Sequence, residues 1–325
     1  MYARSLLFLF FSCLPLCAAD WVTYTGGQGP GAGKHIVFLT GDEEYRSEEG
    51  MPMMARMLAR RHGFKTTVLF AIDPKTGEIN PEVNDNIPGM EALDSADLLV
   101  LFVRWRELPD EQMRHFVDYF LAGKPIIALR TATHSFRYAK NPKSPFADYS
   151  YDSAKWPGGF GQQVLGETWV RHHGKHKFEG TRALTDGLNS RHPILRGVHD
   201  IFVPTDVYSV VHLPADATVL LHGTVTQSLE PDSPPNLEKS LMPVAWARHY
   251  LNEAGRTNRI FTTTMGASVD LLNEDLRRLV VNACYWGLRM DVPERANVDI
   301  VGDYAPIFFG FGDFEKGVKP SRYAP

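Results

Sequence analysis

Cysteine is scarce in this sequence, with three residues among 325, at positions 13, 17 and 284. The first two fall in an amino-terminal segment that we expect to be removed on export, so the mature chain would keep only Cys284 and form no internal disulfide. Cys284 lies in the apolar stretch 279–286, where a thiol is usually a small buried hydrophobic side chain. We therefore predict that Cys284 is not a catalytic nucleophile.

Motifs for phosphate binding and acyl transfer are absent. No G-x-x-x-x-G-K-[ST] segment occurs and no G-x-G-x-x-G follows a predicted strand, which argues against common nucleotide and dinucleotide sites. The turn at residues 129–135 lacks the glycines and the Cys of a nucleophile elbow. Its Ser135 follows His134 directly, and adjacent side chains diverge too far to form a triad. We therefore do not expect acyl-enzyme or amidotransferase chemistry.

Charge of one sign is not concentrated anywhere either. The 34 Lys and Arg residues nearly balance 38 Asp and Glu residues, for a net charge of −4, and no basic run occurs. Nucleic acid is therefore not an expected partner. A hydrophobic fraction of 44% with 22% charged residues excludes a disordered or fibrous chain. No apolar run after residue 16 approaches the length of a membrane span.

The first 19 residues have the pattern of a signal peptide. Arg4 precedes an apolar run at 6–16, and small residues then precede Asp20. This run is too short to cross a bilayer, which needs about 20 apolar residues. Lipidation at Cys17 is the alternative, although Leu16 is an unfavourable neighbour for it. We expect a cleaved signal at 1–19 and export to the periplasm or the cell exterior.

The rest of the sequence alternates short apolar runs with amphipathic segments. The predicted strands are 35–41, 64–72, 97–103, 125–129, 218–222, 243–246 and 259–264, and the predicted helices are 47–62, 109–122 and 273–290. This alternation predicts a single α/β domain with a doubly wound, mainly parallel sheet of the flavodoxin type. We place a flexible leader at 20–33, the domain at 34–291, and a Gly- and aromatic-rich tail at 292–325 that packs on the domain surface.

Three predicted strands end in charged residues. The charged segments are 42–46, 104–106 and 130–134. Ligands of open parallel sheets bind beyond the carboxyl ends of the strands, so these segments predict a site at that edge. The alternative is that the acids cap helices and the arginines are solvated loop residues.

Five of the twelve histidines lie close together, at positions 172, 173, 176, 192 and 199. His172 or His173 could face substrate as an acid/base group, or some of these histidines could bind a divalent metal such as zinc with His134 or a carboxylate. The i, i+4 spacing of His172 and His176 suits a metal on a helix, but Gly174 disfavours a helix there. The segments around His192 and His199 look like turns.

An ordered series of segments is similar to a known family. The segments are 35–41, 133–135, 164–173, 192–197, 206–208, 243–248, 261–266 and 273–274. Together they resemble the trehalose-utilisation (ThuA-like) family, over about residues 34–291. The resemblance implies the fold of class I glutamine amidotransferases without their catalytic cysteine. It also implies a role in carbohydrate metabolism, notably of disaccharides oxidised to keto-sugars.

These considerations lead to a set of expected site residues. We expect the catalytic residues to be His134, His173 and Glu44. The expected substrate-binding residues are Glu43, Arg104, Trp105, Arg130, Trp169, His172 and Asp206. If a metal such as zinc is present, we expect His134 and His173 to bind it.

The function expected from this site is acid/base chemistry on a sugar or oxidised glycoside. A hydrolase, lyase or isomerase would each fit. A non-catalytic sugar-binding or complex-forming module and a metal-dependent hydrolase are the alternatives. The expected partner is a small carbohydrate, and a homo-oligomer is compatible with the sequence.

Overall fold

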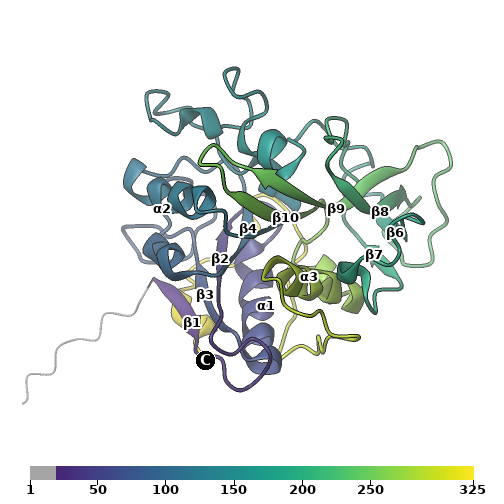
Figure 1. The fold of residues 1–325 in the computed structure, drawn as a ribbon, viewed down its shortest axis with the longest axis horizontal. Coiled ribbons are helices and arrows are strands. Elements are labelled where there is room, and N and C mark those ends of the chain that lie inside the picture. Colours follow the sequence, from purple (N-terminus) through teal and green to yellow (C-terminus); the bar gives the residue numbers. More distant parts are fainter. Residues whose placement is uncertain (1–19) are drawn as a thin grey trace, which may run out of the picture.

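The computed structural model describes residues 20–325, which form one α/β unit around a ten-stranded sheet (Figure 1). The strand order is β1-β3-β2-β4-β5-β10-β9-β8-β6-β7. The strands are β1 Trp21–Tyr24, β2 His35–Gly41, β3 Lys65–Leu69, β4 Leu98–Val103, β5 Ile126–Leu129, β6 Thr181–Thr185, β7 Ile201–Val203, β8 Thr218–Val225, β9 Met242–Leu251 and β10 Thr257–Thr263. The α-helices are α1 Ser47–His62, α2 Asp110–Leu121 and α3 Glu274–Gly287.

Strands β3, β2, β4, β5 and β10 pair in parallel and are covered on both faces. Their near-continuous apolar runs are buried on both sides, as expected for strands between helical layers. Alternate residues of β2 and β4 pack against α1 and α3 on one face and against α2 on the other. This part of the sheet is doubly wound, as the sequence predicts.

Two of the helix ends have a clear local cause. Helix α1 ends at Gly63, which adopts φ 81°, a left-handed conformation that costs glycine little. Helix α3 begins after Asn273, whose side chain accepts a hydrogen bond from the backbone N–H of Leu276. All three predicted helices agree with the observed bounds to within a few residues.

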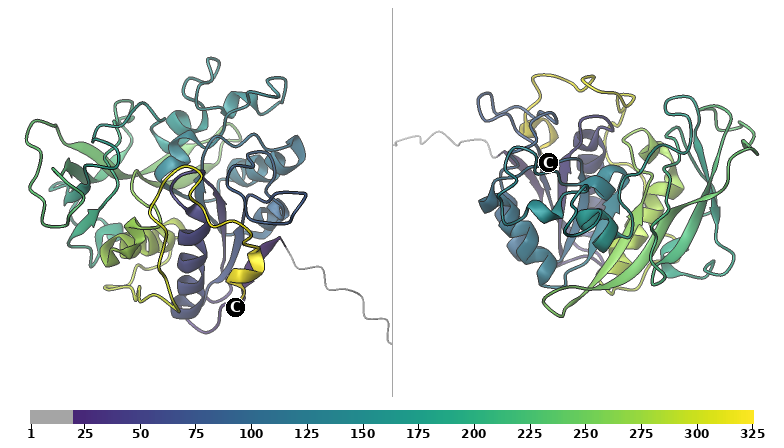
Figure 2. Two further views of the ribbon diagram at one scale, coloured as in Figure 1. Left: turned by 180° about the vertical axis from the view of Figure 1, so that it is seen from behind. Right: turned by 90° about the horizontal axis from the view of Figure 1, so that it is seen from above.

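The other half of the sheet corrects the predicted topology. Strands β10, β9, β8, β6 and β7 pair antiparallel with one another, so the sheet as a whole is mixed and not mainly parallel (Figure 2, right). Strands β9 and β10 are joined by the short turn at residues 252–256, and a short turn can only join antiparallel strands. Apolar runs alone do not reveal strand direction, which is why the sequence did not show this.

Three strands were not predicted. Residues 21–24, within the expected flexible leader, form β1 and pair with β3 at the edge of the sheet. Strands β6 and β7 have three to five residues each, and β6 is partly exposed, so neither gives a strong apolar signal. The expected signal peptide at 1–19 lies outside the described residues.

After α3 the chain runs from residue 288 to the carboxyl terminus with only one short 3-10 turn, Pro320–Tyr323. Figure 2 (left) shows this yellow segment crossing the amino-terminal end of α1 and returning to the sheet edge. Tyr24 donates a hydrogen bond from its hydroxyl to the backbone oxygen of Tyr323 (2.6 Å), which ties the end of the chain to β1.

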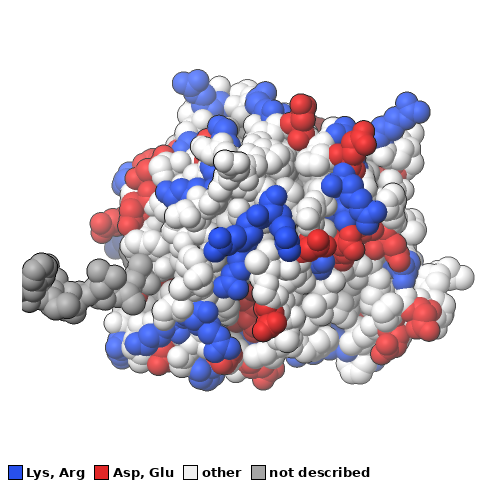
Figure 3. Space-filling view, turned by 90° about the horizontal axis from the view of Figure 1, so that it is seen from below, with Lys and Arg blue, Asp and Glu red and all other residues white. Residues whose placement is uncertain are grey.

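Charged side chains of both signs lie on the face of the molecule drawn in Figure 3. Small groups of Lys and Arg side chains lie there beside small groups of Asp and Glu side chains. Among residues 20–325, no helix is long and apolar enough to cross a membrane.

Candidate functional site

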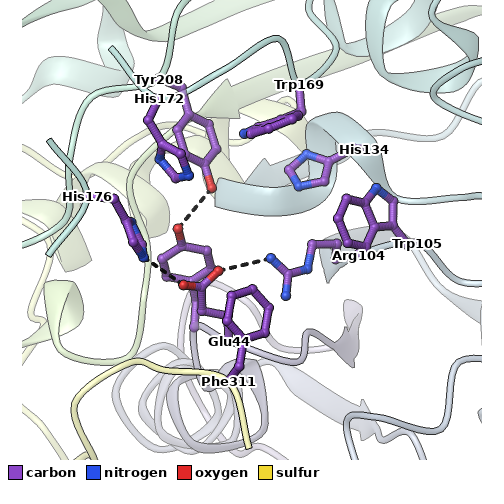
Figure 4. Close-up of a pocket in the computed structure, with 10 residues that line it drawn as sticks. Glu44, Arg104, Trp105, His134, Trp169, His172, His176, Tyr208 and Phe311 are labelled. Carbon is purple, nitrogen blue, oxygen red and sulfur yellow. Dashed lines mark hydrogen bonds and ion pairs between the residues drawn. The ribbon is translucent and has the colours of Figure 1, made fainter. Parts of the chain in front are cut away.

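A cavity of about 200 Å³ opens at the carboxyl edge of the parallel strands, where such folds bind ligands (Figure 4). Three groups of residues form it: strand ends, the loop between residues 165 and 181, and the segment after β7. A residue of the carboxyl-terminal tail completes it. The lining residues are Glu44, Tyr45, Arg104, Trp105, His134, Trp169, His172, His176, Tyr208 and Phe311.

The strand ends supply a buried network of opposite charges. Arg104, after β4, donates from Nη1 to Glu44 (3.0 Å) and from Nε to Glu43 (2.8 Å), both after β2. Arg106 donates to the other oxygen of Glu43 and is fully buried. Glu43 therefore holds two arginines in place, whereas Glu44 and Arg104 face the cavity.

The backbone is strained at the same strand ends. Arg46, Trp105 and Arg130 follow β2, β4 and β5, and have φ values of 60°, 49° and 45°. Residues other than glycine rarely adopt this left-handed conformation, and such strain concentrates at functional sites. Only two other non-glycine residues of the described chain do so. The strain marks the same edge of the sheet that the charge pattern predicts.

Beneath the cavity lies a fully buried ion pair between Arg130 and Asp206. Arg130 donates from Nη2 to Asp206 Oδ1 (3.1 Å) and from Nη1 to the backbone oxygens of Asp206 and Thr264 (2.8 and 2.7 Å). Its guanidinium carbon also lies 4.5 Å from the ring centre of Tyr45 and 3.9 Å from that of Tyr208. The arginine thus fixes the Asp206 carboxylate and two aromatic walls.

Asp206 in turn holds two histidines. His172 donates from Nδ1 to Oδ2 (2.7 Å), and His176 donates from Nδ1 to Oδ1 (3.0 Å). The Nε2 atom of His176 lies 2.8 Å from Glu44 Oε1. The two rings are 4.6 Å apart between centroids, so one carboxylate orients both of them.

This arrangement shifts the pKa values of the groups involved. Burial lowers the pKa of His176, but its hydrogen bonds to Asp206 and Glu44 outweigh this and raise the pKa to about 9. Burial raises the pKa of Asp206, but hydrogen bonds from both histidines and the charge of Arg130 bring it well below its usual value. His176 is therefore an imidazolium near neutral pH, between two carboxylates.

His134 lies on the other side of the cavity, and its pKa is shifted in the opposite direction from that of His176. Its ring contacts Trp105 and Trp169 with centroids 5.8 Å away in each case, and only Thr133 is hydrogen-bonded to it. Burial and the nearby arginine charges hold its pKa well below its usual value. It is a neutral imidazole in an aromatic wall.

The structure brings most of the predicted site residues together. Those that line the cavity are Glu44, Arg104, Trp105, His134, Trp169 and His172. Glu43, Arg130 and Asp206 were expected to bind substrate, but they lie behind the lining, where they hold Arg104, His172 and His176 in place.

His173 does not join His134. Its Nε2 contacts the backbone oxygen of Ser240 (2.9 Å), and the residue is not among those that line the cavity. Neighbouring side chains in an extended segment point in opposite directions, so only one of His172 and His173 can face the site. The structure places His172 there.

Sequence reasoning left four lining residues out of the expected site: Tyr45, His176, Tyr208 and Phe311. The i, i+4 spacing of His172 and His176 was a signal, discounted because Gly174 lies between them. The two rings meet without a helix because Gly174 packs closely on Asp206, where a Cβ would lie 3.0 Å from the aspartate Cβ. Phe311 had no signal beyond the aromatic composition of the tail.

The residues that could hold a metal are His172, His176 and Asp206. Each offers one ligand atom, and these atoms lie within 4.8 Å of one another. Two imidazoles and a carboxylate suit zinc or another divalent transition metal, and Glu44 is close enough to add an oxygen ligand. The set differs from the predicted pair of His134 and His173.

Comparison with known proteins agrees with this architecture. The model of a family described as trehalose utilisation (ThuA) matches residues 35–287. A ThuA-like protein of Parabacteroides merdae aligns over 80% of this chain and 92% of its own, with 13% identity and a TM-score of 0.51. A ThuA-like protein of Bacteroides uniformis aligns over 80% of this chain and 93% of its own, with 15% identity and a TM-score of 0.48. No curated protein matches the sequence. The family resemblance expected from the sequence is confirmed.

Proposed function

The chain belongs to the ThuA family. On this basis we propose that it is an enzyme that acts on a sugar or oxidised (keto) glycoside by acid/base chemistry. The family suggests a carbohydrate-related role. One observation carries the rest: two imidazoles share a single buried carboxylate at the base of a cavity walled by aromatic rings. Aromatic faces suit the apolar faces of sugar rings, and polar groups in the same cavity suit their hydroxyls.

The geometry suits removal of a proton from a carbon beside a keto group. His172 gives its Nδ1–H to Asp206, which leaves Nε2 as the basic nitrogen and orients the ring, as in other His–carboxylate pairs. The proton moves from the sugar carbon to Nε2, and its electron pair forms an enolate with the keto oxygen. Arg104, which lines the cavity and whose Nη2 has no hydrogen-bond partner among the described residues, would supply positive charge to stabilise that oxygen.

Purified protein incubated with keto-disaccharides and the corresponding unoxidised disaccharides tests this proposal. We expect turnover of the keto-sugar, exchange of the proton beside the keto group with deuterium from solvent, and loss of both in His172→Ala. A protein that binds the sugars but neither turns them over nor exchanges the proton would instead be a non-catalytic sugar-binding module.

A metal-dependent hydrolase is the second candidate, favoured by the convergence of His172, His176 and Asp206. A divalent metal held there would polarise a carbonyl or activate water. Elemental analysis of protein purified without chelator checks it: one equivalent of metal that is lost in His176→Ala would support this candidate. Full turnover by metal-free protein would exclude it.

We also propose that the protein is exported, because of the apolar run and small residues within 1–19. Amino-terminal sequencing of protein from its native host checks this. A chain that begins near Asp20 would support cleavage, whereas a lipid on Cys17 or a retained Met1 would contradict it.

A further inference from the structure

The carboxyl-terminal tail lies outside the family match and adds a surface to the site. The match ends at residue 287, and residues 305–312, here called the strap, cross the end of α1 beside the cavity. Figure 4 shows Phe311 rising from this yellow segment at the edge of the cavity, next to Glu44. The strap therefore contributes to a site that residues 35–287 alone would leave open on this side.

The strap is fastened at each end of its path. The backbone N–H of Ile307 donates to Glu49 (2.9 Å), and that of Gly310 donates to the backbone oxygen of Glu44 (2.9 Å). Arg46, fully buried, donates to the backbone oxygen of Gly310. Phe309 is buried and packs on Tyr45 and His176, with ring centroids 5.2 and 5.5 Å apart.

Phe311 stands apart from these anchors. Its side chain lines the cavity and yet is 61% exposed, so the packing of the fold does not account for its position. The guanidinium of Arg104 lies 4.8 Å from the ring centre and covers one part of it. Because Arg104 is already paired with Glu43 and Glu44, the phenyl ring is not needed to shield its charge.

The size of the cavity indicates what Phe311 contacts. A volume of about 200 Å³ is smaller than the roughly 300–1,000 Å³ of pockets that enclose drug-sized ligands. A cavity of this size would take about one sugar ring, so a further part of a substrate would extend through the mouth. Phe311 stands at that mouth, where its exposed face can stack on the apolar face of a second ring.

We propose that Phe311 is a specificity-determining residue that binds the second unit of a disaccharide or glycoside whose first unit occupies the cavity. The inference rests on the proposed function and adds to it a residue, outside the family match, that selects for the second unit of the substrate. The strand ends and histidines would act on the inner ring, and the strap would select for what is attached to it.

Calorimetric titration of protein that comprises residues 20–325 tests the role of Phe311. The ligands are a keto-disaccharide of two glucose units and the matching keto-monosaccharide. For Phe311→Ala we expect roughly tenfold weaker disaccharide binding and less than about a twofold change for the monosaccharide, the scale of one aromatic contact. Phe311→Trp should restore the disaccharide affinity. Phe308→Ala is the matched control, since Phe308 is also exposed on the strap but does not line the cavity.

Three results would overturn the inference. Equal weakening of both sugars by Phe311→Ala would show that the ring contacts the inner unit, and no change for either would show that it contacts neither. Equal effects of Phe308→Ala and Phe311→Ala would show that the strap acts only through its packing. If the unaltered protein binds neither sugar, the proposed function itself fails, and thermal unfolding midpoints for all variants separate this from loss of the fold.

Discussion

The two halves of the sheet contribute to the site in different ways. The parallel half, β3-β2-β4-β5-β10, presents Glu44, Arg104 and His134 directly from its strand ends. The antiparallel half contributes Asp206 and Tyr208 from the segment after β7, and the loop before β6 carries His172 and His176 across to the parallel edge. The parallel half thus provides a fixed platform, and the acid/base groups are brought to it by loops.

Arg130 and Asp206 join these halves, and removing their charge balance should have the largest effect. In Asp206→Asn, the buried Arg130 would lose its ion-pair partner, and only one of the two histidines would keep a hydrogen-bond acceptor on residue 206. We expect a loss of about 3–5 kcal/mol in unfolding free energy, as for a broken buried pair, and at least about a hundredfold loss of turnover.

Urea unfolding and initial rates measure these effects. Asp216→Asn is the control, because Asp216 is half-exposed and pairs with Arg248 away from the cavity. It should change stability by less than about 1 kcal/mol. If Asp206→Asn were no more harmful than this control, the two halves would not be coupled through this pair.

The second-largest effect is expected on turnover when His172, the proposed base, is replaced. His172→Ala should lower turnover by roughly a hundredfold to ten-thousandfold, because a positioned acid or base contributes about that much. The unfolding midpoint should change little, since a third of the His172 side chain is exposed. His173→Ala is the adjacent control and should leave turnover intact. Loss of activity in His173→Ala alone would return the catalytic role to the residue first expected from the sequence.

The same contrast explains what the sequence could reveal. Parallel strands such as β2 and β4 are continuous apolar runs, so their positions, and the strand-end residues Glu44 and Arg104, follow from the pattern. Strand direction in the second half, and the approach of His176 and Asp206, depend on tertiary contacts between loops. Local sequence does not encode these, and Phe311 reaches the site across more than 200 residues from Arg104.

The charge of His176 predicts a pH effect on stability in metal-free protein. Its folded pKa of about 9 lies above the unfolded value of about 6.5, so the folded state binds the proton more tightly. This stabilisation is complete below pH about 6.5 and is lost as the pH rises through about 9. The unfolding midpoint should therefore fall by a few degrees more over this range in the unaltered protein than in His176→Gln. Parallel curves for the two would show that the Asp206 and Glu44 contacts do not hold a charged imidazole.

The smallest effect is expected at Cys284, which belongs to the scaffold of the parallel half. It is fully buried on α3, in the core that also contains residues of β2 and β4, and burial raises the pKa of its thiol well above its usual value. The thiolate needed for alkylation is therefore scarce and inaccessible in the folded protein. We expect iodoacetamide to leave both turnover and mass unchanged under native conditions, and to add one carboxamidomethyl group after unfolding to protein expressed as residues 20–325, which has Cys284 alone. Modification of Cys284 in native protein with loss of turnover but an unchanged unfolding midpoint would show that this helix, and not only the strand ends and loops, takes part in the chemistry.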